Sequence, residues 1–248
     1  MYQPSAEDDI YSQNTHTHGF HHGNEFVKPL TASEHRDLIL QRLACLLGGF
    51  GGAYVLINAG QFASAQTLNM IELVLGFCAL DFPNVLLILG AFLIYAASIL
   101  ISALLSGHGK NLRKIALIVS ALCMLLYSAM PEGMPLQLML YPSFLMMPML
   151  WIAFSVPIRG YNSACIFSTN NLRQTIYSLG SYLCDRDRRH LEKAYFFAGS
   201  LFCFHLGVIL AFVADLFWGQ KAALLSLLLI IYTYILVQKP IPSDKSSE

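Results

Sequence analysis

Long apolar runs separated by short polar stretches dominate the chain from residue 38 onward. Each run holds about twenty residues, the length that a helix needs to cross the hydrocarbon core of a bilayer. The pattern therefore predicts an all-α, polytopic transmembrane helical bundle. The six runs cover residues 38–59, 84–106, 112–130, 134–156, 194–217 and 220–237.

Two further segments, 60–82 and 160–184, are apolar enough to enter a membrane but begin with small and polar residues. Each contains a Thr-x-Asn triplet, Thr67-Leu68-Asn69 in the first and Thr169-Asn170-Asn171 in the second. Irregular backbone at membrane depth is tolerated where protein shelters it. We expect two re-entrant half-helices, with the hydroxyl of Thr67 capping one and that of Thr169 or Ser168 capping the other.

The distribution of basic residues distinguishes two topologies, because Lys and Arg collect in cytoplasmic loops. With six spans and two re-entrant segments, every Lys and Arg except Lys221 lies on the cytoplasmic side. With eight full spans, the cluster of Lys110, Arg113 and Lys114 moves outside. We therefore expect six spans in a bacterial cytoplasmic (inner) membrane, with both the N- and the C-terminus cytoplasmic.

The order of elements repeats along the chain. Residues 38–130 and 134–237 each read as a span, a Thr-x-Asn segment, a span and a span. Because each half has three spans, the second half begins on the opposite side, which makes an inverted repeat of the kind found in secondary transporters. The transmembrane domain covers 38–238, between a disordered cytoplasmic tail at 1–37 and a C-terminal tail at 239–248.

The predicted half-helices supply the candidate site. Two helix N-termini that face the membrane midplane favour an anionic or strongly polar ligand, because each carries a partial positive charge. The alternative is structural, with polar side chains joining interrupted helices. The candidate substrate-binding residues are Thr67, Asn69, Glu72, Thr169, Asn171 and Gln174.

Ionisable side chains within the membrane are expensive and often mark a pathway. Glu72 and His205 are such residues, and together they form a possible proton relay. A neutral His205 bonded to a backbone carbonyl is equally compatible with the sequence. In the same helix, Gly199, Cys203, Gly207 and Ala211 form a small-residue stripe that predicts close helix packing.

Composition limits the other functional classes. Only 12% of the 248 residues are charged and the formal net charge is zero, so nothing favours nucleic acid. The six cysteines are scattered without metal-ligand spacing, and the His-rich run at 16–22 is a compositional feature of a polar tail. No catalytic or nucleotide motif occurs, so we expect no enzyme activity, no cofactor and no metal.

Three motifs stand out along the chain: Gly-Gly-Ala-Tyr at 51–54, Gly-Gln-Phe-Ala-Ser-Ala-Gln-Thr-Leu-Asn at 60–69, and Ile-Phe-Ser-Thr-Asn-Asn-Leu-Arg at 166–173. Together they resemble the YoaK-like family of small bacterial inner-membrane proteins. The resemblance implies a membrane location and a fold, since the family has no assigned activity. This chain departs from the family pattern at Leu68 and Asn170, where glycine is usual, and at Gly52, where many members are acidic.

These features favour a small-solute or ion transporter that works in the lipid bilayer. A homo-oligomer is compatible with them. The alternative is a non-transporting membrane scaffold or regulatory subunit that contacts its partner through the N-terminal tail. An intramembrane enzyme would require Glu72 and His205 to meet in space.

Overall fold

The computed structural model describes residues 29–62, 65–131, 134 and 136–240. The His-rich run and the last eight residues lie outside this part of the chain. The described residues form helices α2 to α9 and one 3₁₀ helix, η1, and none of them forms a strand. The helices are α2 (Ala32–Ala59), α3 (Gln66–Cys78), α4 (Phe82–Gly107), α5 (Leu112–Ala129), α6 (Leu136–Phe154), α7 (Ser168–Asp185), α8 (Arg188–Trp218), η1 (Gly219–Leu224) and α9 (Leu225–Gln238).

Several helices are long and apolar enough to cross a membrane. They are α2, α4, α5 and the continuous run Arg188–Gln238, which folds as α8, η1 and α9. Much of this apolar surface points outward; on α4, for example, Leu86, Leu93 and Leu100 are exposed. A helix that is apolar all round and yet exposed fits a lipid environment better than water.

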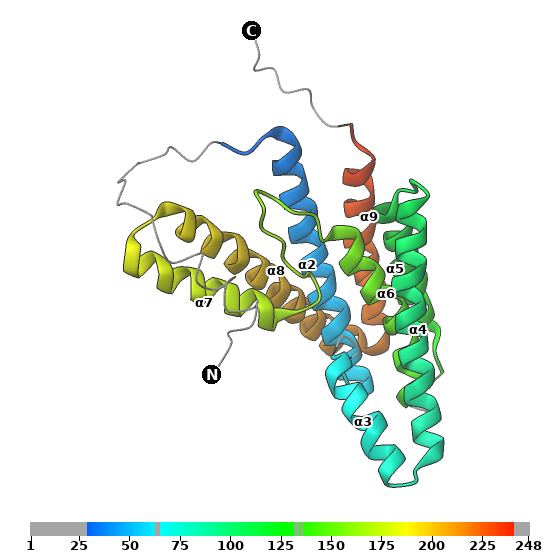
Figure 1. The fold of residues 1–248 in the computed structure, drawn as a ribbon. Helices are drawn as coiled ribbons and strands as arrows, with labels where there is room; N and C mark the ends of the chain where they lie inside the picture. Colours follow the sequence, from blue (N-terminus) through cyan, green and yellow to red (C-terminus); the bar gives the residue numbers. More distant parts are fainter. Residues whose placement is uncertain (1–28, 63–64, 132–133, 135, 241–248) are drawn as a thin grey trace, which may run out of the picture.

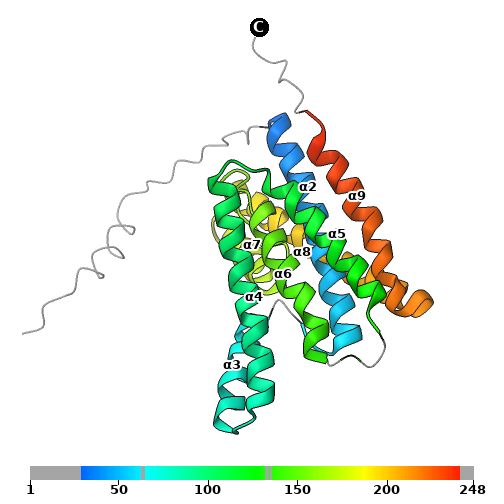
Figure 2. The ribbon, with the colours of Figure 1, turned by 90° about the vertical axis from the view of Figure 1, so that its right-hand side faces the viewer.

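Two hairpins project from a central bundle (Figures 1 and 2). The α3–α4 hairpin extends below the bundle, while α7 and α8 leave it sideways. Helix α2 stands at the centre, where α8 crosses it. The hairpins follow α2 and α6, the first helix of each predicted half.

The helices of the two halves pack in a crossed pattern. The first helix of each half packs against the third helix of the other, so α2 lies against α8 and α6 against α4. Within each half, the second helix packs on the third, α3 on α4 and α7 on α8. The first helices, α2 and α6, also touch, as do the last ones, α5 and α9. Most types of contact made by one half thus have a counterpart in the other.

Polar contacts tie four helix ends together at one end of the bundle. The Arg36 guanidinium, near the start of α2, donates to the carbonyls of Leu236 (3.2 Å) and Val237 (2.9 Å) at the end of α9. Asp37, in the first turns of α2, pairs with Arg113 at the start of α5, with 2.7 Å between Nη1 and Oδ1. Arg113 also donates to a carbonyl near the end of α6.

A second set of contacts joins the opposite ends of these helices. Tyr54 donates its hydroxyl to the carbonyl of Gln220 (2.8 Å), and the Gln220 amide donates to the carbonyl of Tyr127 (2.8 Å) at the end of α5. Asn58 donates to Asp215 (3.1 Å) near the end of α8. Helices α2, α5 and α8 therefore end together, and α9 begins there.

Glycines let α2 and α8 approach until their backbones touch. A Cβ at Gly49 would overlap the carbonyl oxygen of Phe204, and a Cβ at Gly207 would overlap the carbonyl oxygen of Leu46. The predicted small-residue stripe of α8 does serve helix packing, since Gly207 and Ala211 are buried.

Two predicted boundaries are wrong. Helix α2 begins at Ala32 and not at 38, because Thr31 and Glu34 form a capping box: each side chain accepts the other residue's backbone N–H. Helix α8 begins at Arg188 and not at 194, because the Asp187 carboxylate caps it and accepts from the N–H of Arg189. In both cases a polar cap starts the helix ahead of the apolar run.

Candidate functional site

Both Thr-x-Asn triplets lie in the first turn of a helix, but neither threonine caps it. The N-cap positions belong to Ala65 before α3 and Phe167 before α7, and neither side chain makes a capping bond. Thr67 and Thr169 are already inside their helices and are exposed. The prediction that their hydroxyls cap half-helices is wrong, because each helix starts one residue before its threonine.

The chain segments that lead into α3 and α7 meet the same helix. The ring of Phe62, four residues before α3, fills the space next to Gly52 of α2. The carbonyl of Cys165, three residues before α7, lies against Gly48, where a Cβ would overlap it. Since residues four apart lie on one face of a helix, the two segments reach neighbouring turns of one α2 face.

Asn171 is fully buried (0% exposed) and holds the segment before α7 in place. Its Nδ2 donates to the carbonyl oxygens of Ala164 (2.9 Å) and Phe167 (3.0 Å). Its Oδ1 is also buried but has no hydrogen-bond partner in the described part of the chain. Asn171 thus has a structural role and retains one unsatisfied acceptor.

Asn69 occupies the matching place in α3 and is only 7% exposed. Its side-chain Nδ2 is buried and lacks a hydrogen-bond partner among the described residues. Buried polar atoms in proteins are nearly always paired with protein or water. Each of the two matching asparagines therefore offers one buried amide atom to a water or a polar solute.

Glu72 and Gln174, the third members of the two predicted sets, are half-buried. The Glu72 carboxylate accepts a hydrogen bond from Gln61 Nε2 (3.3 Å) and borders a shallow hollow that Asp81 and Asn84 also line. This hollow lies toward the turn between α3 and α4. Gln174 makes no side-chain hydrogen bond to a described residue.

His205 is exposed on α8, and its Nδ1 lies 2.8 Å from the carbonyl oxygen of Leu201. Glu72 lies on α3, in the other hairpin, and its carboxylate accepts a hydrogen bond from Gln61. The structure thus gives the two members of the predicted proton relay separate partners and does not bring them together.

A buried polar cluster between α2 and α8 was not anticipated from the sequence. Gln41 Nε2 donates to Ser200 Oγ (3.4 Å), and Ser163 Oγ, in the segment before α7, donates to the same Ser200 oxygen (3.0 Å). Gln41 Oε1 is buried without a partner in the residues that the structure describes. Single polar residues within apolar runs were the only signal, and nothing in the sequence paired them.

No group of three or more His, Cys, Asp or Glu side chains in the described residues is arranged to hold a metal ion.

The described residues thus form an all-helical fold with two projecting hairpins and with helices long and apolar enough to span a membrane. The chain belongs to the family described as "Protein of unknown function (DUF1275)", whose model matches residues 40–236. No curated protein and no solved structure matches the chain.

Proposed function

We propose that the protein is a membrane transporter for small polar or anionic solutes. Its two half-helix segments would form a polar site beside α2, within six spans arranged as an inverted repeat in a bacterial cytoplasmic membrane. The observation that carries the proposal is the matched pair of asparagines, Asn69 and Asn171, each with a buried amide atom that lacks a partner in the described residues.

The ion pair of Asp37 with Arg113 supports the six-span topology. In an eight-span protein, α2 and α5 would begin on opposite faces of the membrane. A contact of 2.7 Å between the first parts of these helices supports a chain that returns once between them. The crossed packing of α2 with α8 and of α6 with α4 supports the inverted repeat, because a two-fold axis exchanges these pairs.

The surroundings of α2 support a site near the centre of the bundle. Gly48 and Gly52 let the two approach segments come close to the same helix face. Asn171 and Asn69 follow within a few residues of those contacts. The cluster of Gln41, Ser200 and Ser163 continues the polar environment toward the start of α2.

Asn69 carries the most direct test, because its side-chain Nδ2 is buried and has no hydrogen-bond partner in the described residues. Purified protein in proteoliposomes would be challenged on solid-supported membranes with concentration jumps of acetate, phosphate, sulfate and glutamate. Glycerol, as a neutral polar solute, would be followed by light scattering. We expect a signal with at least one solute that disappears in Asn69→Ala.

The matched control is Asn170→Ala, which removes the same amide from the half-buried neighbour of Asn171. Its carboxamide oxygen accepts only an exposed bond from Arg173 (3.2 Å). We expect Asn170→Ala to transport like the wild type. Unchanged transport in Asn69→Ala, or no movement of any of these solutes by the wild type, would refute the proposal.

The bonds of Asn171 favour a second candidate, a non-transporting scaffold or regulatory subunit. Both of its Nδ2 bonds end on its own approach segment, which is what a purely structural asparagine would do. Deletion of residues 1–28 tests this candidate and leaves the Thr31–Glu34 capping box intact. Loss of the cellular phenotype with unchanged solute movement would favour the scaffold.

A further inference from the structure

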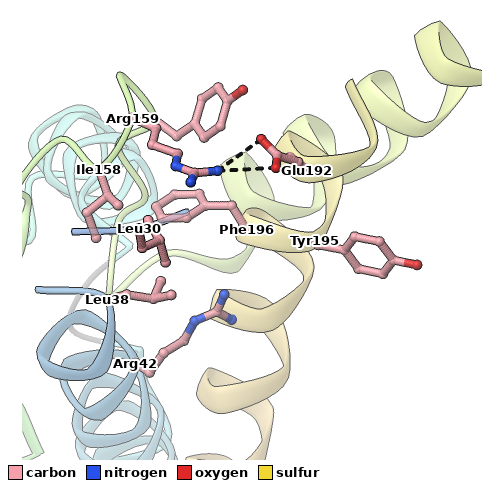
Figure 3. Close-up of a pocket in the computed structure, with 9 residues that line it drawn as sticks. Leu30, Leu38, Arg42, Ile158, Arg159, Glu192, Tyr195 and Phe196 are labelled. Carbon is pink, nitrogen blue, oxygen red and sulfur yellow. Dashed lines mark hydrogen bonds and ion pairs between the residues drawn. The ribbon is translucent and has the colours of Figure 1, made fainter. Parts of the chain in front are cut away.

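A cavity of about 240 Å³ opens between the first part of α2, the first part of α8 and the segment after α6 (Figure 3). Apolar side chains form most of its wall, and charged groups lie at its ends. Its lining includes Leu30, Leu38, Arg42, Ile158, Glu192 and Phe196. No residue of either Thr-x-Asn triplet contributes to it, although Tyr161 at the start of the second segment does.

The charges in this cavity do not cancel. Arg159 and Glu192 form an ion pair in which Nη1 lies 3.2 Å from each carboxylate oxygen. Arg42 lines the same cavity and makes no hydrogen bond or ion pair with any described residue. Two guanidinium groups and one carboxylate leave one net positive charge, and that charge belongs to Arg42.

Arg42 is positioned by the helix opposite. Its guanidinium lies over Gly199 of α8, where a Cβ would overlap it. Figure 3 shows the side chain reaching from α2 toward α8, apart from the Arg159–Glu192 pair and with Leu38 close by. A guanidinium carries five N–H donors, and a half-buried charge without a partner is costly. The space beside it therefore suits a group that brings negative charge and acceptor oxygens.

We propose that this cavity binds an amphipathic oxyanion, a carboxylate or a phosphate joined to an apolar group. Arg42 would hold the oxyanion, since a guanidinium matches carboxylate and phosphate in a two-pronged geometry. Leu30, Leu38 and Phe196 would cover the apolar part. The site goes beyond the proposed transport activity and does not depend on it.

Two sources supply this chemistry. An anionic phospholipid would reach the cavity from the membrane. Basic residues gather at the end of the bundle where α2 begins, and they would attract its headgroup. A soluble organic anion reaches it from the aqueous side. Direct binding distinguishes the two sources without any transport assay.

Binding would be measured calorimetrically on the purified full-length protein in a neutral detergent. The probes are octanoate, inorganic phosphate and dihexanoyl phosphatidylglycerol, with zwitterionic dihexanoyl phosphatidylcholine as the comparison. We expect at least one anionic probe to bind more tightly than phosphatidylcholine. Arg42→Gln should weaken that binding about tenfold or more, as expected for the loss of charged hydrogen bonds.

The matched control is Arg173→Gln, which removes an equal charge from the exposed side of α7 and should change affinity less than about twofold. Gly199→Ala leaves the charge in place but fills the space of the guanidinium, and it should weaken binding as well. If Arg42→Gln does not fold, Arg42→Lys, which retains the charge and loses the fork, is compared in its place.

When Arg42 is replaced, loss of octanoate binding alone identifies a soluble carboxylate, and loss of phosphatidylglycerol binding alone identifies a lipid. Each of these two results supports the site, whereas a protein that binds inorganic phosphate but neither amphipathic anion would contradict it. Equal affinity of wild type and Arg42 variants for every probe would overturn it, as would a wild type that binds no anionic probe.

Discussion

Asp37 and Arg113, 76 positions apart in the chain (113 − 37), form an ion pair that joins the first parts of α2 and α5, with 2.7 Å between Oδ1 and Nη1. Each side chain is 23% exposed, so the pair is largely shielded from water. Because α2 and α5 begin at the same end of the bundle, α3 and α4 together make a single return. This relationship supports the six-span topology proposed above.

The Asp37–Arg113 pair should show measurable coupling. In a double-mutant cycle with Asp37→Asn and Arg113→Gln, followed by thermal unfolding in detergent, we expect about 1 kcal/mol of coupling, the upper end for ion pairs near a surface. Asp187 and Arg189 serve as the comparison, because the Arg189 side chain is 73% exposed. Their coupling should be about 0.3 kcal/mol or less. Equal coupling in both pairs would show that the first pair gains nothing from its shielding.

Two native cysteines report the topology of the hairpins. Cys78 at the end of α3 and Cys184 at the end of α7 are exposed, whereas Cys45, Cys123 and Cys165 are buried. In an inverted repeat, the ends of the two hairpins lie on opposite faces of the membrane. We expect a membrane-impermeant maleimide to label Cys78 in intact cells and Cys184 only after permeabilisation, measured in Cys184→Ser and Cys78→Ser. Protection of both cysteines in intact cells would instead indicate eight full spans.

The glycines of α2 should tolerate no side chain. In Gly49→Ala, the added methyl group would overlap the carbonyl of Phe204 and force α2 away from α8. We expect a loss of about 1–3 kcal/mol or more, visible as aggregation in size-exclusion chromatography or as a lower Tm. The control is Gly180→Ala in α7, where a Cβ meets nothing within 4 Å. That change should be neutral or should stabilise the helix by roughly 0.5–1 kcal/mol, and a similar loss in both variants would contradict the packing explanation.

The two matched asparagines should differ in their effect on stability. Asn171→Ala removes both donors that hold the carbonyls of Ala164 and Phe167, at a cost of about 1–3 kcal/mol. Asn69→Ala removes an amide whose Nδ2 has no partner in the described residues, so the Tm should stay the same or rise. Thermal unfolding of both variants checks this, and a larger loss in Asn69→Ala would mean that its amide is satisfied in the membrane.

Acid should reduce the stability of the start of α8 only at low pH. The side chain of Arg189, and then its backbone N–H, donate to the Asp187 carboxylate and lower the pKa of Asp187 below its usual value of 3.8. Since the folded pKa lies below the unfolded one, the stabilisation is complete above pH 3.8 and is lost as the pH falls through the folded pKa. The Tm difference between wild type and Asp187→Asn should therefore be present at pH 5 and shrink near pH 3.

Helix positions were largely predictable because they depend on local composition. The apolar runs located α2, α4, α5 and α8. The Thr-x-Asn triplets marked the starts of α3 and α7, which begin at Gln66 and Ser168, each one residue before its threonine. The early start of α2 was also readable, because Thr31 and Glu34 have the spacing of a capping box. A boundary based on hydropathy alone overlooks such polar first turns.

The partners of buried polar groups were not predictable, because they depend on which helices meet. Nothing near Gln41 in the sequence indicates that Ser200 is its partner, and nothing near Arg42 indicates that Gly199 makes room for it. The same limit applies to Asn171, whose bonds to its own approach segment depend on how that segment folds back.

The contact of α2 with α8 also determines when the protein can fold during its synthesis. Gln41 and Ser200 are 159 residues apart, and a ribosome that adds roughly 5–20 residues per second needs about 8–30 seconds to make the chain between them. Throughout that interval, the glycine-rich face of α2 lacks the helix that covers it. Because each half supplies the partner of the other half's first helix, neither half is a finished folding unit on its own. Assembly therefore has to wait until nearly the whole chain has been made.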